Sequence, residues 1–416
     1  MNNNTFDLQL FALADMTIDA NLTQQAWADE LWTSAQKDLY FAKFIGNSEE
    51  FIIQKKDQLG KEAGDHITMP LIARLIAPGI TGDNTLTGNE EPYATYDFPV
   101  YVDQIAKSIR LKGKMSQQKT KYSMRKTAKT LLTQWMQEYM DQQFFTVLST
   151  TPTANRVVYA GGRASDSLIQ TGDTMTVSLI SKAKRKATLA GQPVPLTTSG
   201  GTVSIVAGGF VVTGSGTGFT TDFVVGDLIT VGTQANYIVS IASATSLSVA
   251  AQWNTTSSGA SYSAIRYNGA RSKLRPVIVD GHKFFVAVIH PWQERDLRQD
   301  PDWLGAQESF AAWRGYDNPI FKGGIGLIDG VIVHTHENVL VTQDGVSNGN
   351  VGHALLMGAQ AGCMAVAQEP DWVEDPLQDF QRQPGFATSM IWGVAKSNFN
   401  GEDFATVQIV TSAVSD

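Results

Sequence analysis

The sequence has one cysteine, no long apolar run and no excess of positive charge. Cys363 is the only cysteine among 416 residues, which excludes an internal disulfide and a cysteine-rich zinc site. No apolar run reaches the length of a transmembrane helix, and the Asn-rich stretch 1–13 lacks the basic region of a signal peptide. The net charge of −8 argues against sequence-specific nucleic-acid binding as the main task. We expect a protein made in a cytoplasm.

The composition and length fit a soluble protein of two to three domains. The hydrophobic content is 43% and the charged content 17%, both ordinary values for globular chains. A chain of this length can bury a sizeable core.

The longest regular feature is a helix predicted over residues 116–149. No Pro or Gly occurs between Met115 and Thr150, Ser116 is a suitable N-cap, and Pro152 follows the expected end. At 1.5 Å per residue this helix is roughly 50 Å long. Its apolar residues recur at steps of three and four, which is helical periodicity: Tyr122, Ala128, Leu131, Leu132, Trp135, Tyr139, Phe145 and Leu148.

The charges on this helix oppose its dipole. Lys119, Lys121 and Arg125 lie in the first half, whereas Glu138 and Asp141 lie in the second. The helix dipole favours the reverse order by up to about 1 kcal/mol per charge, so packing must hold the helix. The basic end either faces an anionic neighbour or polyanion, or is a solvated face.

The segment 67–111 is predicted to form a long protruding hairpin. Residues 67–77 are strand-like, and Phe98, Val100 and Val102 alternate on the returning arm. The intervening tip, 78–92, is rich in turn residues and acidic. An isolated two-stranded hairpin is marginally stable in water, so we expect it to lie across a neighbouring molecule. Upstream, a helix is expected from Thr23 to Gly46, ending in an aromatic-rich connector.

Residues 196–267 are predicted to form a small all-β domain inserted into a host domain. Asp222, Asp227 and Arg266 are its only charged residues, and short β-branched runs alternate with Gly/Ser turns. The run Gly214–Gly218 lacks the Lys-Ser/Thr of a phosphate loop and is expected to be a turn.

The flanking host segments are predicted to be of mixed α and β structure. Helices are expected at 176–189, after Pro291 and Pro301, and at 354–367; strands are expected at 277–279, 284–289, 325–328, 331–335, 390–396 and 404–411. The helix 176–189 carries the basic run Lys182, Lys184, Arg185 and Lys186, which could touch nucleic acid non-specifically, although a solvated face is the simpler interpretation.

Few residues suggest catalysis. His334 and His336 share a strand face and Glu337 follows, which is the best metal constellation available, yet no third His lies nearby. His290 before Pro291 is expected to be structural, and Cys363 is expected to be a small hydrophobe on the helix 354–367. We expect no enzyme activity and no cofactor.

The order of these elements resembles the major capsid proteins of tailed bacteriophages with the Hong Kong 97-type fold, and in particular the capsid family typified by the podovirus N-four coat protein. The similarity rests on Lys37-Asp38-Leu39-Tyr40-Phe41-Ala42-Lys43-Phe44-Ile45-Gly46, Gly79-Ile80-Thr81-Gly82-Asp83-Asn84-Thr85-Leu86-Thr87-Gly88-Asn89-Glu90-Glu91, Gly113-Lys114-Met115-Ser116-Gln117-Gln118, Leu274-Arg275-Pro276-Val277, His290-Pro291-Trp292 and Ile391-Trp392-Gly393-Val394. Only 196–268 lacks a counterpart in the family core.

The resemblance implies an α+β fold in five parts. These are an N-terminal arm and helix (1–66), an extended loop (67–112), a peripheral domain with the spine helix and the start of the axial domain (113–195), the inserted all-β domain (196–268), and the axial domain with a return to the peripheral domain (269–416). Candidate residues for contacts between subunits are Asp83, Glu90, Glu91, Arg74, Lys119, Lys121 and Arg125.

The implied function is structural. Hexamers and pentamers would form an icosahedral head around double-stranded DNA, assembled in the host bacterial cytoplasm, with portal, scaffold or decoration proteins as further partners. The DNA contact would be non-specific, and no membrane partner is expected. Few residues precede Trp27, so we expect a separate scaffold or none. The alternatives are an encapsulin-like compartment, a metal-dependent hydrolase using His334 and His336, and a surface adhesin, which would leave the long helix unexplained.

Overall fold

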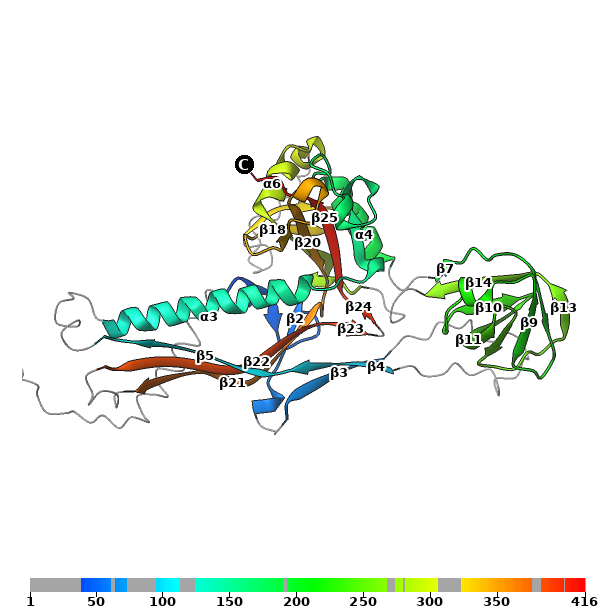
Figure 1. Ribbon diagram of the computed structural model, residues 1–416, viewed down its shortest axis with the longest axis horizontal. Helices are drawn as coiled ribbons and strands as arrows, with labels where there is room; N and C mark the ends of the chain where they lie inside the picture. Colours follow the sequence, from blue (N-terminus) through cyan, green and yellow to red (C-terminus); the bar gives the residue numbers. More distant parts are fainter. Residues whose placement is uncertain are drawn as a thin grey trace, which may run out of the picture.

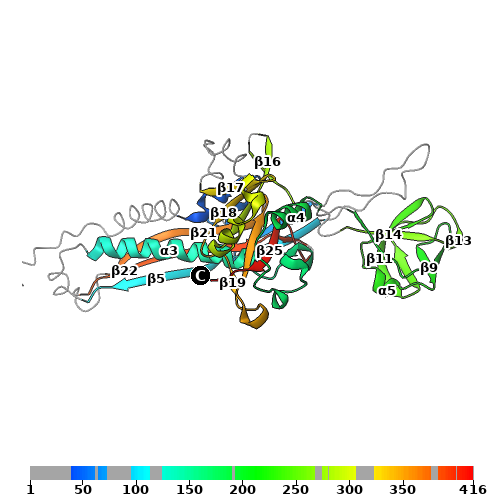
Figure 2. The same ribbon diagram turned by 90° about the horizontal axis from the view of Figure 1, so that it is seen from above.

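The computed structural model describes residues 39–60, 64–72, 95–112, 124–189, 193–267, 274–279, 281–305, 323–375, 383–399 and 401–415. These residues form an elongated molecule (Figures 1 and 2). A long helix lies along a long sheet at one end, a compact α/β body stands over the middle, and a separate β module lies at the other end.

Helix α3 (Met124–Ser149) covers a five-stranded sheet with the order β1-β2-β21-β22-β5. The strands are β1 (Ile45–Gly46), β2 (Ile53–Lys56), β21 (Gly362–Asp375), β22 (Gly385–Lys396) and β5 (Asp103–Arg110). The helix buries one apolar stripe, made of Ala128, Leu132, Met136, Met140, Phe144, Phe145 and Leu148. The predicted helix is therefore present from residue 124 onward. Its predicted start at Ser116 lies outside the described residues, as do residues 23–38 of the helix expected from Thr23 to Gly46. The described end of that expected helix is a 3₁₀ helix, η2 (Tyr40–Phe44), followed by β1, so this part of the expectation is wrong.

The hairpin pairs β3 (His66–Ile72) with β4 (Thr95–Tyr101) in antiparallel register. Residues 103–110, which we expected on the returning arm, pair with β22 instead. The chain therefore leaves the hairpin after Tyr101 and enters the long sheet, where β5 is an edge strand.

The compact body is built on a second sheet with the order β17-β18-β16-β20-β25-β6. Its strands are β17 (Gly324–Ile328), β18 (Val331–Thr335), β16 (His282–Ile289), β20 (Val351–Met357), β25 (Thr406–Ser412) and β6 (Val157–Tyr159), with β15 (Val277–Val279) and β19 (Val341–Thr342) paired beside them. Helices α4 (Val177–Thr188) and α6 (Pro291–Arg298) pack on it. Small elements, the 3₁₀ helix η2 (Tyr40–Phe44) and the hairpin β23 (Asn398–Phe399) and β24 (Glu402–Asp403), lie where the body meets the long sheet.

The predicted helix over 354–367 is wrong. This stretch contains the end of β20, a turn at Gly358–Gln360 and the start of β21. All seven residues of β20 are buried because the strand lies between β16 and β25 and is covered on both faces. A continuously apolar strand shows no two-residue alternation, so periodicity could not distinguish it from a buried helix. Cys363 accordingly lies on a strand.

The β module is one continuous eight-stranded sheet with its own core. The order is β13-β8-β9-β12-β11-β10-β14-β7. The strands are β7 (Pro193–Pro195), β8 (Thr202–Ile205), β9 (Val211–Ser215), β10 (Leu228–Val231), β11 (Gln234–Ser243), β12 (Ser246–Val249), β13 (Ser257–Ala260) and β14 (Tyr262–Tyr267), with the short helix α5 (Phe219–Asp222). The largest side chain in its core is the fully buried Trp253. Since β14 pairs with β7, the chain enters and leaves the module through two adjacent strands.

Candidate assembly surfaces

The β3–β4 hairpin has one apolar face that is progressively uncovered toward its tip. Register places three cross-strand pairs on this face, Ile67 with Val100, Met69 with Phe98, and Leu71 with Tyr96. Ile67 and Val100 are buried, and the Phe98 ring lies 5.0 Å from the ring of Phe399 in the body. Both members of the outermost pair are only half-buried. The described residues therefore cover the outer part of this face only partly.

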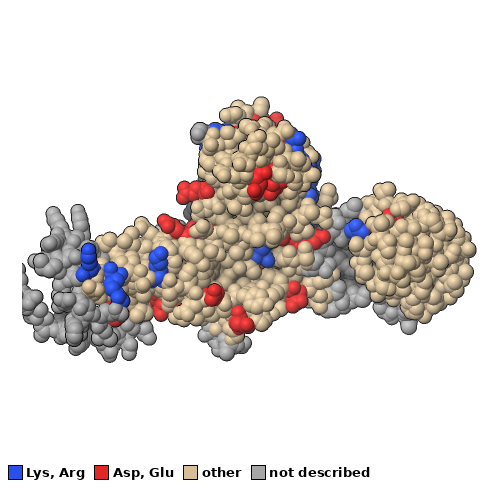
Figure 3. Space-filling model, in the orientation of Figure 1, with Lys and Arg blue, Asp and Glu red and all other residues tan. Residues whose placement is uncertain are grey.

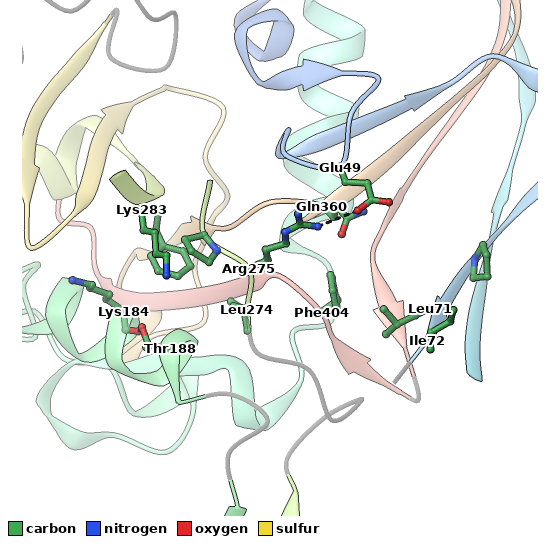
Figure 4. A pocket seen from close by; sticks show the side chains of 13 residues that line it. Glu49, Leu71, Ile72, Lys184, Thr188, Leu274, Arg275, Lys283, Gln360 and Phe404 are labelled. Atoms are coloured by element: carbon green, nitrogen blue, oxygen red, sulfur yellow. Dashed lines mark hydrogen bonds and ion pairs between the residues drawn. The ribbon is translucent and has the colours of Figure 1, made fainter. Parts of the chain in front are cut away.

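A groove of about 960 Å³ lies beside the hairpin, between β3, α4 and the segment 274–276 (Figure 4). Its walls include the apolar side chains of Leu71, Leu274, Phe285 and Phe404 and the basic side chains of Lys184, Arg275 and Lys283. The Arg275 guanidinium pairs with Glu49 at 3.1 Å. The groove therefore continues the half-covered hairpin surface onto the body.

The basic end of α3 already has an acidic partner within the chain. Arg125 donates from Nε to Oε1 of Glu374 at 2.7 Å, linking the helix to β21. Both side chains are partly exposed, so this ion pair contributes at most about 1 kcal/mol. Figure 3 shows basic side chains gathered at this end of the molecule. Of the seven predicted contact residues, only Arg125 lies in the described ranges; Arg74, Asp83, Glu90, Glu91, Lys119 and Lys121 lie outside them.

The two histidines of the predicted metal constellation lie in an aromatic cluster. His334 is fully buried on β18, and its Nδ1 lies 3.1 Å from the Lys43 ammonium. The His336 ring stacks on Phe145 with centroids 4.8 Å apart, and the Tyr40 ring lies 4.3 Å from it. His334 lies on β18, whereas His336 follows the end of this strand at Thr335, so the two do not share a strand as predicted. Both rings contact Tyr40 of η2, and His336 also contacts Phe145 of α3.

The electrostatics of this cluster are those of a buried structural site. Burial lowers the Lys43 pKa to about 8 and, as the largest cause, lowers the pKa of His336. Both imidazoles pack on aromatic rings, His334 against Phe44 and His336 against Phe145, so their role here is structural. Within the described part of the chain, no group of three or more His, Cys, Asp or Glu residues could hold a metal ion.

The other singled-out residues also have structural roles. His290 caps α6, its Nδ1 accepting from the backbone N–H of Trp292 at 3.2 Å. Cys363 is 1% exposed, and burial raises the pKa of its thiol to about 11. No helix in the described ranges is long and apolar enough to cross a membrane.

Sequence reasoning missed one structural junction. The Lys396 ammonium donates to the carbonyl oxygens of Thr150 at 2.6 Å and Thr151 at 3.2 Å, and pairs with the Asp403 carboxylate at 2.8 Å. These contacts join the end of α3, the end of β22 and β24, where the long sheet meets the body. No sequence signal marks it, because Lys396 and Thr151 are 245 residues apart.

Comparison with known proteins places these surfaces in context. A family model described as phage capsid protein matches residues 16–151 and 227–415, which is most of the chain. The chain therefore belongs to this family, whose members are structural and not enzymes. It is a bacteriophage major capsid protein with the Hong Kong 97-type α+β fold, a component of the virion capsid.

Individual relatives agree. The major capsid protein of Pseudomonas phage KPP25 is 25% identical over 412 residues, covering 94% of this chain and 96% of the relative. The capsid of Ralstonia phage GP4 superposes with a TM-score of 0.66 at 27% identity, covering 91% of this chain and 92% of that one. The capsid asymmetric unit of Cyanophage Pam1, 21% identical with a TM-score of 0.61 and coverage of 90% and 92%, shares the fold.

The family model leaves unmatched a different range from 196–268, the range that we expected to lack a counterpart. The internal stretch that the model leaves unmatched is 152–226, which includes α4 and ends before β10. The expectation that only 196–268 lacks a counterpart is therefore wrong, because β10 to β14 lie within the matched range.

Proposed function

We propose that copies of this chain assemble as hexamers and pentamers into the icosahedral head that encloses the phage double-stranded DNA. The observation that carries the proposal is the apolar hairpin face, which is buried at Ile67 and Val100 but only half-covered at Leu71 and Tyr96. Burying apolar surface contributes about 25 cal/mol per Å². A neighbouring subunit that covers this face therefore stabilises the contact between the two subunits.

In this proposal the five parts expected from the sequence keep their roles. Residues 67–112 are the extended loop, of which the β3–β4 hairpin reaches a neighbour while 103–110 stay in the long sheet of their own chain. Residues 113–195 carry the spine helix, 196–268 are the inserted domain, and 269–416 are the axial domain with its return to the peripheral domain. Residues 1–66 are the N-terminal arm and helix. Portal, scaffold or decoration proteins are the further partners, and assembly takes place in the host bacterial cytoplasm.

Charge adds a second, weaker contact in the proposed shell. The acidic tip residues Asp83, Glu90 and Glu91 lie over basic residues of a neighbour, with Lys119, Lys121 and Arg125 as candidates. Arg74, near the tip in sequence, is a further candidate. Glu374 holds the Arg125 guanidinium in place within the chain, and this supports the proposal that carboxylates of a neighbouring subunit also bind Arg125. Each exposed pair contributes about 0–1 kcal/mol, but a shell repeats the contact at every interface.

Packaged DNA is contacted only non-specifically. Two basic residues of α4 are engaged within the chain, Lys184 with Asp329 at 2.7 Å and Lys186 with the carbonyl oxygen of Val157 at 2.7 Å. A net charge of −8 suits a container wall along which DNA must move, because many free cations would bind its phosphates.

Expression of the chain followed by size-exclusion chromatography and negative-stain microscopy tests assembly. The proposal predicts closed particles built from the intact chain, or open sheets of hexamers when a scaffold is required. A chain that remains monomeric under all conditions, including coexpression with other proteins of the same phage, would contradict the proposal. DNA inside particles purified from infected cells separates a phage head from an encapsulin-like compartment.

A further inference from the structure

The β module has a surface almost without charge. Arg266 donates from Nε and Nη2 to the two carboxylate oxygens of Asp227 at 2.9 and 2.7 Å, and Asp227 is buried. The Asp222 carboxylate accepts from the backbone N–H and the hydroxyl of Ser199 at 2.7 and 2.6 Å. All three charged residues of 196–267 are thus satisfied within the module. Figure 3 shows one face of the module, which is almost free of charged side chains away from the end nearest the body.

Exposed valines form a row across the outer face of this module. Val211 on β9 pairs with Ser248 on β12, which in turn pairs with Ser240 on β11; the adjacent Val239 lies in a bulge of that strand. The inward neighbours Val212, Leu247 and Ile238 are in the core, so the outer partners face away from it.

The row continues beyond β11. The backbone N–H of Gly226 donates to the carbonyl oxygen of Ile238 at 2.8 Å, which brings the turn with Val224 and Val225 beside Val239. The exposed fractions are 50% for Val211, 52% for Val224, 62% for Val225 and 53% for Val239. Four aliphatic side chains from three adjacent segments are therefore half-exposed or more, and Ser248 and Ser240 lie between Val211 and Val239 in the register.

We propose that this valine row (Val211, Val224, Val225 and Val239) is a contact surface for the same module of a second copy of the chain. The inference rests on the proposed shell, in which every module has identical neighbours at fixed positions. Two uncharged faces approach without repulsion and without desolvating an ion, whereas a charged partner finds no counter-charge on this face. Apolar surface on an isolated soluble module is normally separated by charged side chains, which this face lacks.

Cross-linking in assembled particles tests the contact. The native thiol does not interfere, because Cys363 is 1% exposed and its pKa is raised to about 11. Single variants Val239→Cys and Val225→Cys are treated with a bis-maleimide, and Ser258→Cys is the matched control, since Ser258 is exposed on the edge strand β13 at the other end of the sheet. Each variant carries one reactive thiol, so every cross-link joins two chains.

The expected result is a cross-linked dimer that is at least several-fold more abundant in Val239→Cys or Val225→Cys particles than in Ser258→Cys particles, and absent when particles are dissociated first. Equal or no cross-linking in intact particles overturns the inference. If a variant does not assemble, a cryo-EM map of unmodified particles decides: modules that meet through the valine row support the contact, and a row that faces solvent or a different protein overturns it. Failure of the unmodified chain to form particles counts against the proposed shell itself.

Discussion

The Asp141 carboxylate on α3 accepts the backbone N–H of Tyr40 at 3.1 Å, across 101 residues of sequence. Its other oxygen accepts from the N–H of Phe41 at 3.4 Å. The 3₁₀ helix η2 has Leu39 at its N-cap position, which offers no side-chain acceptor, so the cap comes from the spine helix instead. This contact fixes the segment that follows the N-terminal arm to the longest helix of the subunit.

Asp141→Asn is expected to remove a pH dependence of stability. Burial, the largest cause, raises the Asp141 pKa to about 6 from its ordinary 3.8. The native state therefore binds the proton more tightly than the unfolded chain, and the native protein gains stability as pH falls through this range. In urea unfolding of unassembled subunits, the wild type should gain about 1–3 kcal/mol relative to the variant between about pH 7 and pH 4. A constant or falling difference would contradict the assignment.

Lys396→Met is expected to destabilise the junction between the long sheet and the body. The substitution leaves the Asp403 carboxylate, whose side chain is 1% exposed, without its ion-pair partner. Breaking a buried pair from one side costs about 3–5 kcal/mol. The double variant Lys396→Met with Asp403→Asn should lose less than Lys396→Met alone, because no charge is left unpaired. A double variant that loses the sum of the two single effects would show that the ion pair is not coupled.

The two ends of the hairpin face should respond differently to substitution. Phe98→Ala should cost about 3–5 kcal/mol of subunit stability, because Phe98 is buried against Phe399. Leu71→Asp should leave the subunit folded, since Leu71 is only partly buried at the edge of the core, but should reduce the yield of particles. Circular dichroism of subunits and sedimentation of assembled material measure the two effects. Full assembly of Leu71→Asp would remove the hairpin face from the proposed interface.

The charge-reversing double variant Glu90→Lys with Glu91→Lys should impair assembly while the subunit stays folded. The reason is that the proposed acidic tip would then face like charge on its neighbour, and such repulsion is repeated over the shell. The matched control is Asp302→Lys with Asp344→Lys, two exposed carboxylates on the body. Electron micrographs showing normal particles for the Glu90/Glu91 variant would refute the role of the tip.

Deletion of the module should be tolerated better than loss of the hairpin. Ile265 and Pro195 are register partners, so an Asn-Gly turn can join the two strands after residues 196–264 are removed. The remaining chain keeps its own cores because the module core is separate. Particles should form but lose heat resistance, since contacts between modules are missing. A deleted chain that forms no particle would show that the module is integral to assembly.

Much of the fold was predictable where local chemistry decides the structure. The turn Asp329-Gly330 between two apolar runs predicts the β17–β18 hairpin, which is present with Asp329 and Gly330 both at positive φ. His290 followed by Pro291 predicts the start of α6, and the structure adds a capping box. These signals act between residues that are adjacent in sequence, so they do not depend on how the rest of the chain folds.

The remaining features depend on contacts that are distant in sequence. β20 is buried on both faces only because β16 and β25 flank it, and nothing between Ala354 and Met357 signals this. β5 pairs with β22 across almost 300 residues, so the sequence of 103–110 could equally extend the hairpin. The Asp141 cap and the Lys396 junction are likewise invisible until the fold places them together. Of the predicted contact residues, the structure tests none, since their partners belong to another subunit.

A cryo-EM map of the assembled particle tests the central claim most directly, by tracing the segment 67–111 in each subunit. The account predicts that the β3–β4 hairpin leaves its own body beyond the Met69–Phe98 pair and lies across an adjacent subunit, which covers Leu71 and Tyr96. A map in which the segment packs only against its own chain, and touches no neighbouring copy, would contradict it.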